Sequence, residues 1–175
     1  SLGDAFSYDD LCMVQVFGSA WQLLIIGDNQ LGRYLAEFAH MTGFGVTICD
    51  PRETAFLTAP SDQVGARRDM PDDAVRALVQ GPRWAVVTVA HDPKVDDMAL
   101  MEALQSQAFY VGALGSRRTS EARRKRLLAV GVSEAMTERL SAPVGLDIGS
   151  KTPPEIALSV MAEIVAVRSA LAARD

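Results

Sequence analysis

The chain has 175 residues, which suits a single α/β domain because domains usually contain about 100 to 200 residues. Apolar residues make up 49% of the chain and charged residues 22%, a balance that excludes a disordered or fibrous protein. The formal net charge of −5 provides no global positive field, so we expect no nucleic-acid partner, and any anion site must be local.

The sequence also favours the cytoplasm. No apolar run approaches the roughly 20 residues of a membrane-spanning helix, and we recognise no signal peptide, so we expect no membrane insertion. Cys12 and Cys49 are too few for a disulfide framework and lack the spacing of metal ligands. We therefore expect both thiols to act as small hydrophobic groups in a reducing compartment.

The first elements form a predicted β-α-β unit. The continuous apolar run from Leu23 to Ile26 is typical of a parallel strand that is covered on both faces. A helix with one apolar stripe follows and ends at Gly43. Val46 to Cys49 supplies the second strand, which Pro51 terminates because proline cannot donate a hydrogen bond to the sheet.

Strands and helices continue to alternate after this unit. Residues 54–65 lack periodicity and are predicted to form a surface loop. The other predicted elements are helices over Asp72–Val79, Pro93–Gln107, Ser116 or Thr119 to near Gly131, and Pro153–Ala172, and strands over Trp84–Ala90, Ala108–Gly112 and, at an edge, Leu140–Val144. Because parallel strands need crossover connections, this alternation predicts a mainly parallel sheet with helices on both faces.

The first candidate site is the glycine loop after the first strand. A dinucleotide-binding loop has the pattern Gly-x-Gly-x-x-Gly, with an acid that binds ribose about 20 residues later. Gly27 and Gly32 match the outer glycines, and Asp50 stands at the position of the acid. Asn29 replaces the middle glycine, and Asp28 adds a negative charge beside any phosphate. The loop is therefore either a degenerate nucleotide site or a tight turn whose glycines serve packing.

The second candidate lies just past the strand over residues 84–90, where open α/β sheets bind their ligands. His91 can hydrogen-bond, protonate or orient a ligand there. Asp92 either contacts the ligand or caps the next helix, and Asp96 and Asp97 are expected on the solvated first turn of that helix. A metal site made from His91, Asp92 and Asp96 is a weaker alternative, and we assign no metal ligand.

The third candidate is the turn before the basic helix, and it is the best anion site in the sequence. Gly115 lets backbone N–H groups face a ligand, Ser116 offers a hydroxyl, and the helix N-terminus adds partial positive charge. Arg117 and Arg118 add forked donors that suit a phosphate. We predict phosphate or pterin binding here, and we expect residues Arg123 to Arg126 to cover a solvent-facing part of the helix.

The fourth candidate is the loop from Pro143 to Lys151. Its two glycines indicate either a close backbone approach or a bare turn. Thr152 and Glu155 then form a capping box, so Glu155 is expected to be a cap rather than a catalyst. No nucleophile elbow or Walker loop occurs in the sequence, and hydrolase and kinase chemistry therefore lack support.

Together these motifs resemble the XdhC/CoxI family over roughly Trp21 to Arg168. The matching strings are Gly27 to Gly32, Asp50-Pro51-Arg52, His91-Asp92, Gly112-x-x-Gly115-Ser116-Arg117-Arg118, Pro143-x-Gly145-Leu146-Asp147-Ile148-Gly149, and Thr152-Pro153-x-Glu155-Ile156-Ala157 through Ala162-Glu163-Ile164. In that family they belong to the Rossmann-like carboxyl-terminal domain of accessory proteins that bind molybdenum cofactor. The family's usual Gly-Ala-Gly is Gly27-Asp28-Asn29 in this chain.

The resemblance implies a three-layer Rossmann-like sandwich over residues 21–175, with residues 1–20 as an N-terminal extension or remnant. Val14 to Phe17 is then an extra strand or part of an interface. The implied cofactor-binding residues are Gly27, Gly32, Asp50, Arg52, His91, Asp92, Gly115, Ser116, Arg117 and Arg118, and no catalytic residue is implied. Apolar side chains that are compatible with a homodimer are Val14, Val16, Phe17 and Trp21.

The leading interpretation of function is a cytoplasmic maturation factor, more a cofactor-binding chaperone than a catalyst. It would hold molybdenum cofactor (molybdopterin) and assist its insertion into an apo-molybdenum hydroxylase such as xanthine dehydrogenase. The alternative is an NAD(P)-dependent oxidoreductase that uses the glycine loop and Asp50, with Arg52 available to a 2′-phosphate. A third interpretation is a scaffold domain that docks on a hydroxylase without a ligand.

Overall fold

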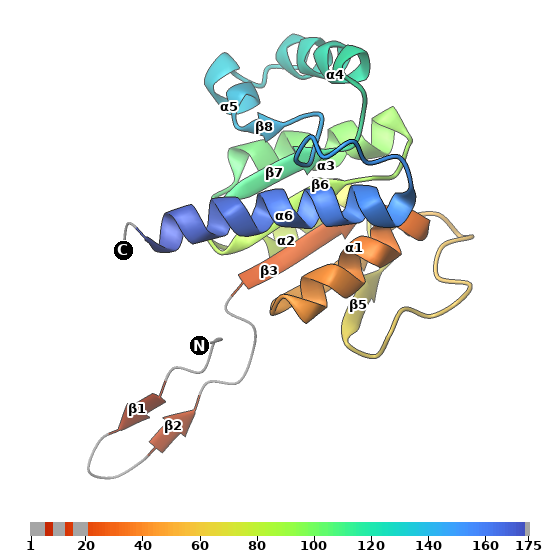
Figure 1. Cartoon of the computed structure of the whole chain (residues 1–175). Coiled ribbons are helices and arrows are strands. Elements are labelled where there is room, and N and C mark those ends of the chain that lie inside the picture. The colour runs from red at the N-terminus through yellow and green to blue at the C-terminus, as the bar shows by residue number, and fades with distance from the viewer. Residues whose placement is uncertain (1–5, 9–12, 16–20, 174–175) are drawn as a thin grey trace.

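A computed structural model describes residues 6–8, 13–15 and 21–173 of the chain. A six-stranded sheet forms its centre, in which every neighbouring pair of strands is parallel (Figure 1). The strands are β3 (Trp21–Ile26), β4 (Phe44–Cys49), β5 (Val64–Arg67), β6 (Trp84–Thr88), β7 (Tyr110–Ala113) and β8 (Leu140–Ser141). Their order, β5-β4-β3-β6-β7-β8, is that of the Rossmann fold, which confirms the predicted fold class.

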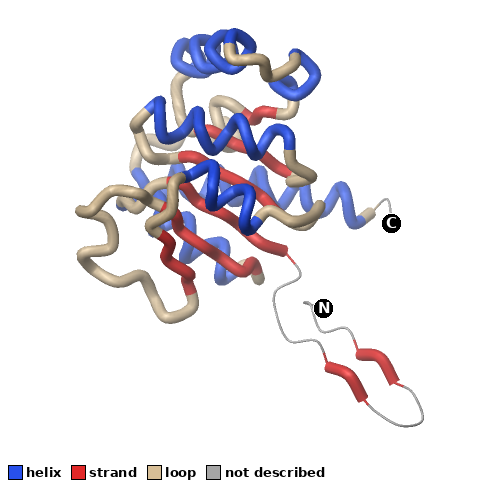
Figure 2. The backbone as a smooth tube through the Cα atoms, turned by 180° about the vertical axis from the view of Figure 1, so that it is seen from behind, coloured by secondary structure: helices blue, strands red, loops and turns tan. Residues whose placement is uncertain are grey.

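Helices cover both faces of this sheet (Figure 2). They are α1 (Gln30–Met41), α2 (Pro71–Leu78), α3 (Pro93–Gln105), α4 (Arg117–Ala129), α5 (Glu134–Glu138) and α6 (Pro153–Ala172). One hydrophobic core joins the sheet to α1 and α6, and a second joins it to α2, α3 and α4. Outside the sheet, β1 (Phe6–Tyr8) and β2 (Met13–Gln15) pair antiparallel.

Strand β3 shows why the sheet lies in the middle. Leu23 and Ile25 pack into the core under α1 and α6, whereas Leu24 and Ile26 pack into the core under α2 and α3. All four side chains are fully buried. The unbroken apolar run therefore marks a strand buried on both faces, as predicted from the sequence.

Two predictions at the sheet edges need correction. The predicted loop over residues 54–65 ends in β5, whose sequence Val64-Gly65-Ala66-Arg67 has little intrinsic strand preference and is stabilised by its pairing with β4. The edge strand predicted over Leu140–Val144 is shorter, because β8 ends at Ser141 and Pro143 has no N–H to donate. Of the residues considered for a homodimer, Val14 lies in β2, and Val16 and Phe17 lie outside the described residues.

The predicted capping box of the last helix is confirmed. The backbone N–H groups of Lys151 and Thr152 both donate to Glu155 Oε2 at 2.9 Å. These hydrogen bonds lower the pKa of Glu155, as expected for a carboxylate that caps a helix. Cys49 is fully buried, and burial raises the pKa of its thiol to about 12, so it behaves as a small hydrophobic group. Cys12 lies outside the described residues.

The helices in the described part of the chain differ in length and hydropathy from membrane spans. None of them is both long and apolar enough to cross a bilayer. Trp21, at the start of β3, is half-buried, and its ring packs edge-on against Phe109 with 5.0 Å between ring centroids.

Leu100 on α3 offers a test of the second core, because its side chain is fully buried between α3 and the sheet. We expect Leu100→Ala to lower the free energy of unfolding by about 2 to 5 kcal/mol, through lost apolar burial and the cavity left behind. Leu57→Ala is the control, since Leu57 is 84% exposed, and it is expected to change stability by less than about 0.5 kcal/mol. Urea denaturation measures both, and equal losses would contradict this account of the core.

Candidate functional site

Three loops meet at the carboxyl edge of the sheet, around the point where the strand order reverses between β3 and β6. Backbone hydrogen bonds tie them together: Val89 N–H donates to Ile26 O at 2.8 Å, and Leu114 N–H donates to Thr88 O at 2.9 Å. Open α/β sheets bind ligands in the crevice at such a switch point. The loops after β3, β6 and β7 are therefore the candidate site.

A pocket of about 360 Å³ opens between the loops after β6 and β7, which is the size of a small-molecule site. Its lining residues are His91, Pro93, Asp96, Leu114, Gly115, Thr119 and Arg123. Two of the predicted site residues, His91 and Gly115, are among them. Gly115 is required at the wall because a Cβ there would lie 2.6 Å from Thr119 Oγ1.

A buried ion pair forms the floor of this pocket. Arg123 Nη2 lies 2.9 Å from Asp96 Oδ2, and the two side chains are only 6% and 2% exposed. Arg123 Nη1 donates to Leu114 O at 2.9 Å, and Ala90 N–H donates to Asp96 Oδ1 at 3.2 Å. The guanidinium thereby ties α4 to α3 and to the loop after β7.

These positions correct two expectations from the sequence. Arg123 does not cover a solvent-facing helix, because it shares the buried face of α4 with Ser120 and Leu127 at helical spacings of three and four residues. Asp96 is not solvated either, since the start of α3 packs against α4. Arg124 also departs from the expectation, because its guanidinium donates to the carbonyl oxygens of Leu140 and Ala142.

Burial changes the acidity of the pocket floor. Desolvation raises the pKa of Asp96 to about 6, although the Arg123 charge and the Ala90 N–H act in the opposite direction. The neighbouring carboxylate of Asp97 accepts from Arg126 Nε at 2.6 Å and from Arg123 Nε at 3.3 Å. The acidic floor is therefore matched by two arginines from α4.

The mouth of the pocket carries uncompensated positive charge. Ser116 caps α4, and Thr119 N–H donates to Ser116 Oγ at 3.2 Å. Arg117 and Arg118 occupy the first turn of α4 with exposed side chains, and within the described part of the chain neither side chain has a hydrogen-bond or ion-pair partner. Backbone N–H groups in the first turn of a helix also lack intrahelical partners. The third candidate site thus presents two guanidinium groups and amide donors at one helix start.

His91 and Asp92 stand on the opposite side of the mouth. His91 is exposed and has a φ of 61°, a left-handed conformation that costs energy for a residue with a Cβ and often occurs at functional sites. Asp92 caps α3, since Lys94 N–H donates to its Oδ1 at 2.9 Å, so the capping interpretation is confirmed. Among residues 6–8, 13–15 and 21–173, no group of three acidic, histidine or cysteine side chains is arranged to hold a metal.

The glycine loop after β3 is filled by the chain's own side chains. Asn29 caps α1: its Oδ1 accepts from Gly32 N–H at 2.9 Å, and its Nδ2 donates to Val89 O at 2.7 Å. Gly27 has a φ of 119°, and a Cβ there would lie 2.8 Å from Ala90 Cα. The loop after β3 is therefore packed directly on the loop after β6.

Asp50, at the position of a ribose-binding acid, is buried and paired. Arg52 Nε and Nη2 lie 2.9 and 2.6 Å from its two oxygens, and Asp28 N–H donates to Oδ2 at 2.8 Å. Burial acts to raise the pKa of Asp50, but these hydrogen bonds and the Arg52 charge together hold it below its usual value. Asp50 and Arg52 thus lie together, and neither lines the 360 Å³ pocket.

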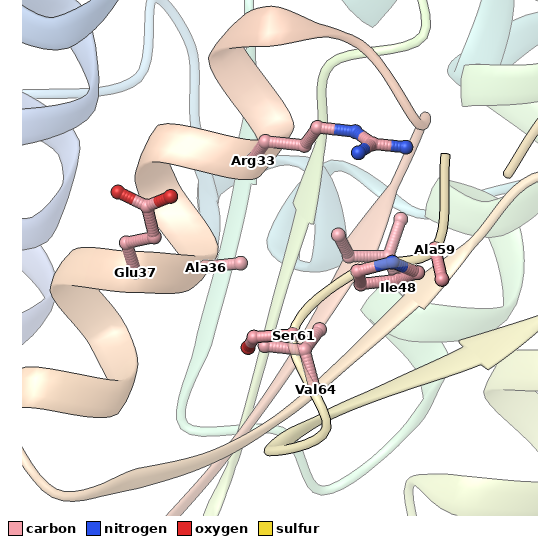
Figure 3. Close-up of a pocket in the computed structure, with 8 residues that line it drawn as sticks. Arg33, Ala36, Glu37, Ile48, Ala59, Ser61 and Val64 are labelled. Atoms are coloured by element: carbon pink, nitrogen blue, oxygen red, sulfur yellow. The ribbon is translucent and has the colours of Figure 1, made fainter. Parts of the chain in front are cut away.

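The carboxylate of Asp28 is also engaged. Arg33 Nε donates to Asp28 Oδ1 at 2.8 Å, and Phe56 N–H donates to Oδ2 at 2.7 Å. Arg33 Nη2 continues to Thr58 O at 2.7 Å, so the segment after β4 is held against α1. Figure 3 shows the Arg33 side chain reaching from α1 toward the segment that carries Ala59, above a second, smaller pocket of about 160 Å³.

The fourth candidate loop makes its close approach to a helix. Gly145 has a φ of 97°, its N–H donates to Glu163 Oε2 at 2.7 Å, and a Cβ there would meet Ser159 Oγ at 2.5 Å. Tyr110 OH donates to the same Glu163 oxygen at 2.5 Å, and burial raises the pKa of Tyr110. These contacts explain Gly145 as a packing residue between β7 and α6.

Sequence reasoning missed part of the pocket. Leu114, Thr119 and Arg123 line it but carry no motif of their own. A helical projection of α4 would have found Arg123, because it places this residue beside Ser120 and Leu127 on the face that points inward. The partner of Arg123, by contrast, depends on how α3 and α4 pack, and the local sequence does not encode it.

The buried pair gives a testable pH dependence. Arg123→Met leaves the Asp96 carboxylate without its cation, so we expect the free energy of unfolding at about pH 8 to fall by about 3 to 5 kcal/mol. In the variant the pKa of folded Asp96 rises further above its unfolded value, and such a group adds stability at low pH that is lost as the pH rises through the folded pKa. The deficit is therefore expected to shrink toward about pH 5 in urea denaturation.

Arg126→Met is the matched control, because Arg126 is on the same helix and pairs with Asp97, but its side chain is 46% exposed. An exposed pair contributes only about 0 to 1 kcal/mol. An Arg123→Met deficit that does not change with pH, or an equal deficit in Arg126→Met, would contradict the role given to burial.

Comparison with known proteins places this geometry in a family. The family described as the XdhC Rossmann domain matches residues 23–164. The chain is 33% identical over 167 residues to the uncharacterized protein YqeB of Escherichia coli (strain K12), which covers 89% of this chain and 29% of YqeB. It is 31% identical over 154 residues to a probable xanthine dehydrogenase subunit of Bacillus subtilis (strain 168), which covers 86% and 44%. A shorter match, 38% over 84 residues, is to the molybdenum cofactor insertion chaperone PaoD of Escherichia coli (strain K12), with 48% and 26% covered.

A solved structure agrees with these sequence matches. The crystal structure of a xanthine dehydrogenase (BH1974) from Bacillus halodurans is similar over 90% of this chain and 46% of its own, with a TM-score of 0.73 and 26% identity. The chain spans less than half the length of each of these relatives. The family match covers the whole sheet from β3 to β8 and most of α6. The chain belongs to the XdhC family, and residues 23–164 are its Rossmann domain.

Proposed function

We propose that this chain is a cytoplasmic binding protein for molybdenum cofactor and assists its insertion into an apo-molybdenum hydroxylase such as xanthine dehydrogenase. The cofactor is cargo rather than a resident group. Its phosphate would bind at the start of α4, and its pterin would enter the pocket between His91 and Gly115. The names of two relatives, a molybdenum cofactor insertion chaperone and a probable xanthine dehydrogenase component, support this proposal.

The observation that carries the proposal is the pair of arginines beside the pocket. Arg117 and Arg118 lack partners in the described part of the chain, whereas the guanidinium groups of Arg33, Arg52 and Arg123 are all engaged. A phosphate accepts forked hydrogen bonds from arginine and is stabilised at a helix N-terminus. The charge balance at this corner thus favours an anionic guest in a chain whose net charge is negative.

The chemistry of the pocket also suits a pterin. Its lining combines apolar surface from Pro93 and Leu114 with polar groups from Thr119 and Arg123. Small-molecule sites usually have this composition, mostly apolar with a few convergent polar groups. Among the described residues that line the pocket, no pair forms a nucleophile with an activating base, which supports a carrier more than a catalyst.

The oxidoreductase alternative has less support. A nicotinamide dinucleotide needs free N–H groups at the start of α1 and a free acid after β4. Asn29 already accepts from Gly32 N–H, and Asp50 already binds Arg52. These contacts favour the carrier over an NAD(P)-dependent enzyme.

The arginine pair gives a direct test of the proposal. We expect the double variant Arg117→Ala, Arg118→Ala to bind molybdenum cofactor about 10- to 100-fold more weakly, because hydrogen bonds to a charged group contribute about 1.5 to 3 kcal/mol each before losses. Equilibrium dialysis with fluorescence detection of the pterin measures this change. Arg83→Ala is the matched control, since Arg83 is exposed and precedes β6 at the opposite edge of the sheet. Unchanged binding in the double variant would place the cofactor elsewhere.

The oxidoreductase alternative is tested by calorimetric titration with NAD+ and NADP+. We expect no saturable heat at concentrations up to about 1 mM, which limits any affinity to less than about 4 kcal/mol. Micromolar binding of either nucleotide would instead favour a dinucleotide-dependent enzyme.

A further inference from the structure

The two halves of the crevice differ in what they leave free. On the β6 and β7 side, the pocket is open, and Arg117 and Arg118 have no partner among the residues that the structure describes. On the β3 and β4 side, the polar groups that a Rossmann fold normally offers to a nucleotide are hydrogen-bonded to one another. This asymmetry bears on which form of the cofactor the site can accept.

We propose that the site is selective for a cofactor that ends in a phosphate monoester, and that Asn29, Asp28 and Asp50 exclude a form extended by a nucleotide. The inference rests on the proposed function, because it concerns the same crevice and the same guest. It assigns to Gly27, Gly32, Asp50 and Arg52 a part in closing the crevice, in place of the cofactor contacts expected from the sequence.

Asn29 closes the place where a pyrophosphate would lie. Its side chain bridges Gly32 N–H at the start of α1 to Val89 O after β6, with distances of 2.9 and 2.7 Å. A phosphate that approached α1 would have to displace this amide and would leave the Val89 carbonyl without its donor. Loss of a partner for a buried polar group is costly, so Asn29 disfavours a nucleotide that crosses from β6 to β3.

Charge reinforces this barrier. Asp28 and Asp50 place two carboxylates at the end of β3 and β4, with side chains that are 5% and 2% exposed. The two cations beside them, Arg33 and Arg52, are already paired with these carboxylates at 2.8 and 2.6 Å. Within the described residues this network keeps no unpaired cation to receive a second phosphate, and the two acids would repel it.

The ribose contact is missing for the same reason. Both oxygens of Asp50 accept hydrogen bonds, from Arg52 and from the Asp28 N–H. The segment after β4 is fixed over this carboxylate, since Phe56 N–H and Arg33 both bind Asp28, and Arg68 donates to Ala55 O at 2.7 Å. A nucleoside would therefore meet a closed surface where other Rossmann folds present a free acid.

The test compares two forms of molybdenum cofactor, one ending in a phosphate monoester and one extended by CMP. Binding of each to the full chain is measured by equilibrium dialysis with fluorescence detection of the pterin. We expect the monoester form to bind at least about tenfold more tightly, since the extension must break two or more hydrogen bonds of the closed network. Free CMP at millimolar concentration is expected not to displace the monoester form.

Two variants examine the closing residues themselves. Asp28→Ala with Asn29→Gly restores a Gly-Ala-Gly loop and is expected to reduce the preference to less than about threefold, mainly by tighter binding of the extended form. Arg52→Ala is the second variant, because it frees an oxygen of Asp50 while the cap of α1 stays intact, and it is expected to shift the preference in the same direction. Glu37→Ala is the control: Glu37 is exposed on α1, outside the network, and its loss is expected to leave the ratio unchanged.

The outcomes separate this inference from the proposed function. Equal or tighter binding of the extended form by the parent chain would overturn the inference and leave the carrier function standing. A parent chain that binds neither form would overturn the carrier function itself. A preference that survives unchanged in both folded variants would overturn the assignment of selectivity to Asn29, Asp28 and Asp50.

Discussion

One guanidinium holds the candidate site together. Arg123 reaches from α4 to Asp96 on α3 and to the Leu114 carbonyl after β7, and all three residues are buried or partly buried. A buried charge is tolerated only where such partners compensate it. The pair therefore fixes where α4 begins relative to the sheet edge, and with it the position of the two arginines on the first turn. The pocket exists in its present shape because this contact does.

The pairing of charges also divides the crevice. The guanidinium groups of Arg33 and Arg52, near the glycine loop, are paired with carboxylates, whereas Arg117 and Arg118 have no partner in the described ranges of the chain. Asn29 completes the division by joining the start of α1 to the loop after β6. A fold that commonly binds dinucleotides across its switch point thus offers open donors on one side of that point in this chain.

Much of the fold could be predicted from the sequence, because its signals are local. Leu23 to Ile26 marked the central strand, and the capping boxes at Ser116 and Thr152 marked the starts of α4 and α6 within a residue. Strand β5 could not be predicted, since Val64-Gly65-Ala66-Arg67 becomes a strand only by pairing with β4. Propensity is a weak guide where tertiary pairing decides.

The candidate site was predictable to a smaller extent. His91 and Gly115 were found because they follow buried strands, which is where such folds bind ligands. The pairing of Asp96 with Arg123 was not, because these residues are far apart in the sequence and only the packing of α3 on α4 brings them together. Motifs locate the loops at a sheet edge, but the ion pairs that decide which loop is free depend on tertiary structure.

A crystal structure of the chain with molybdenum cofactor bound tests the central claim most directly. The account predicts the phosphate against the first turn of α4, within hydrogen-bond reach of Arg117 or Arg118, and the pterin between His91 and Gly115. Cofactor density on the β3 side of the crevice, or both guanidinium groups directed away from the bound phosphate, would contradict it.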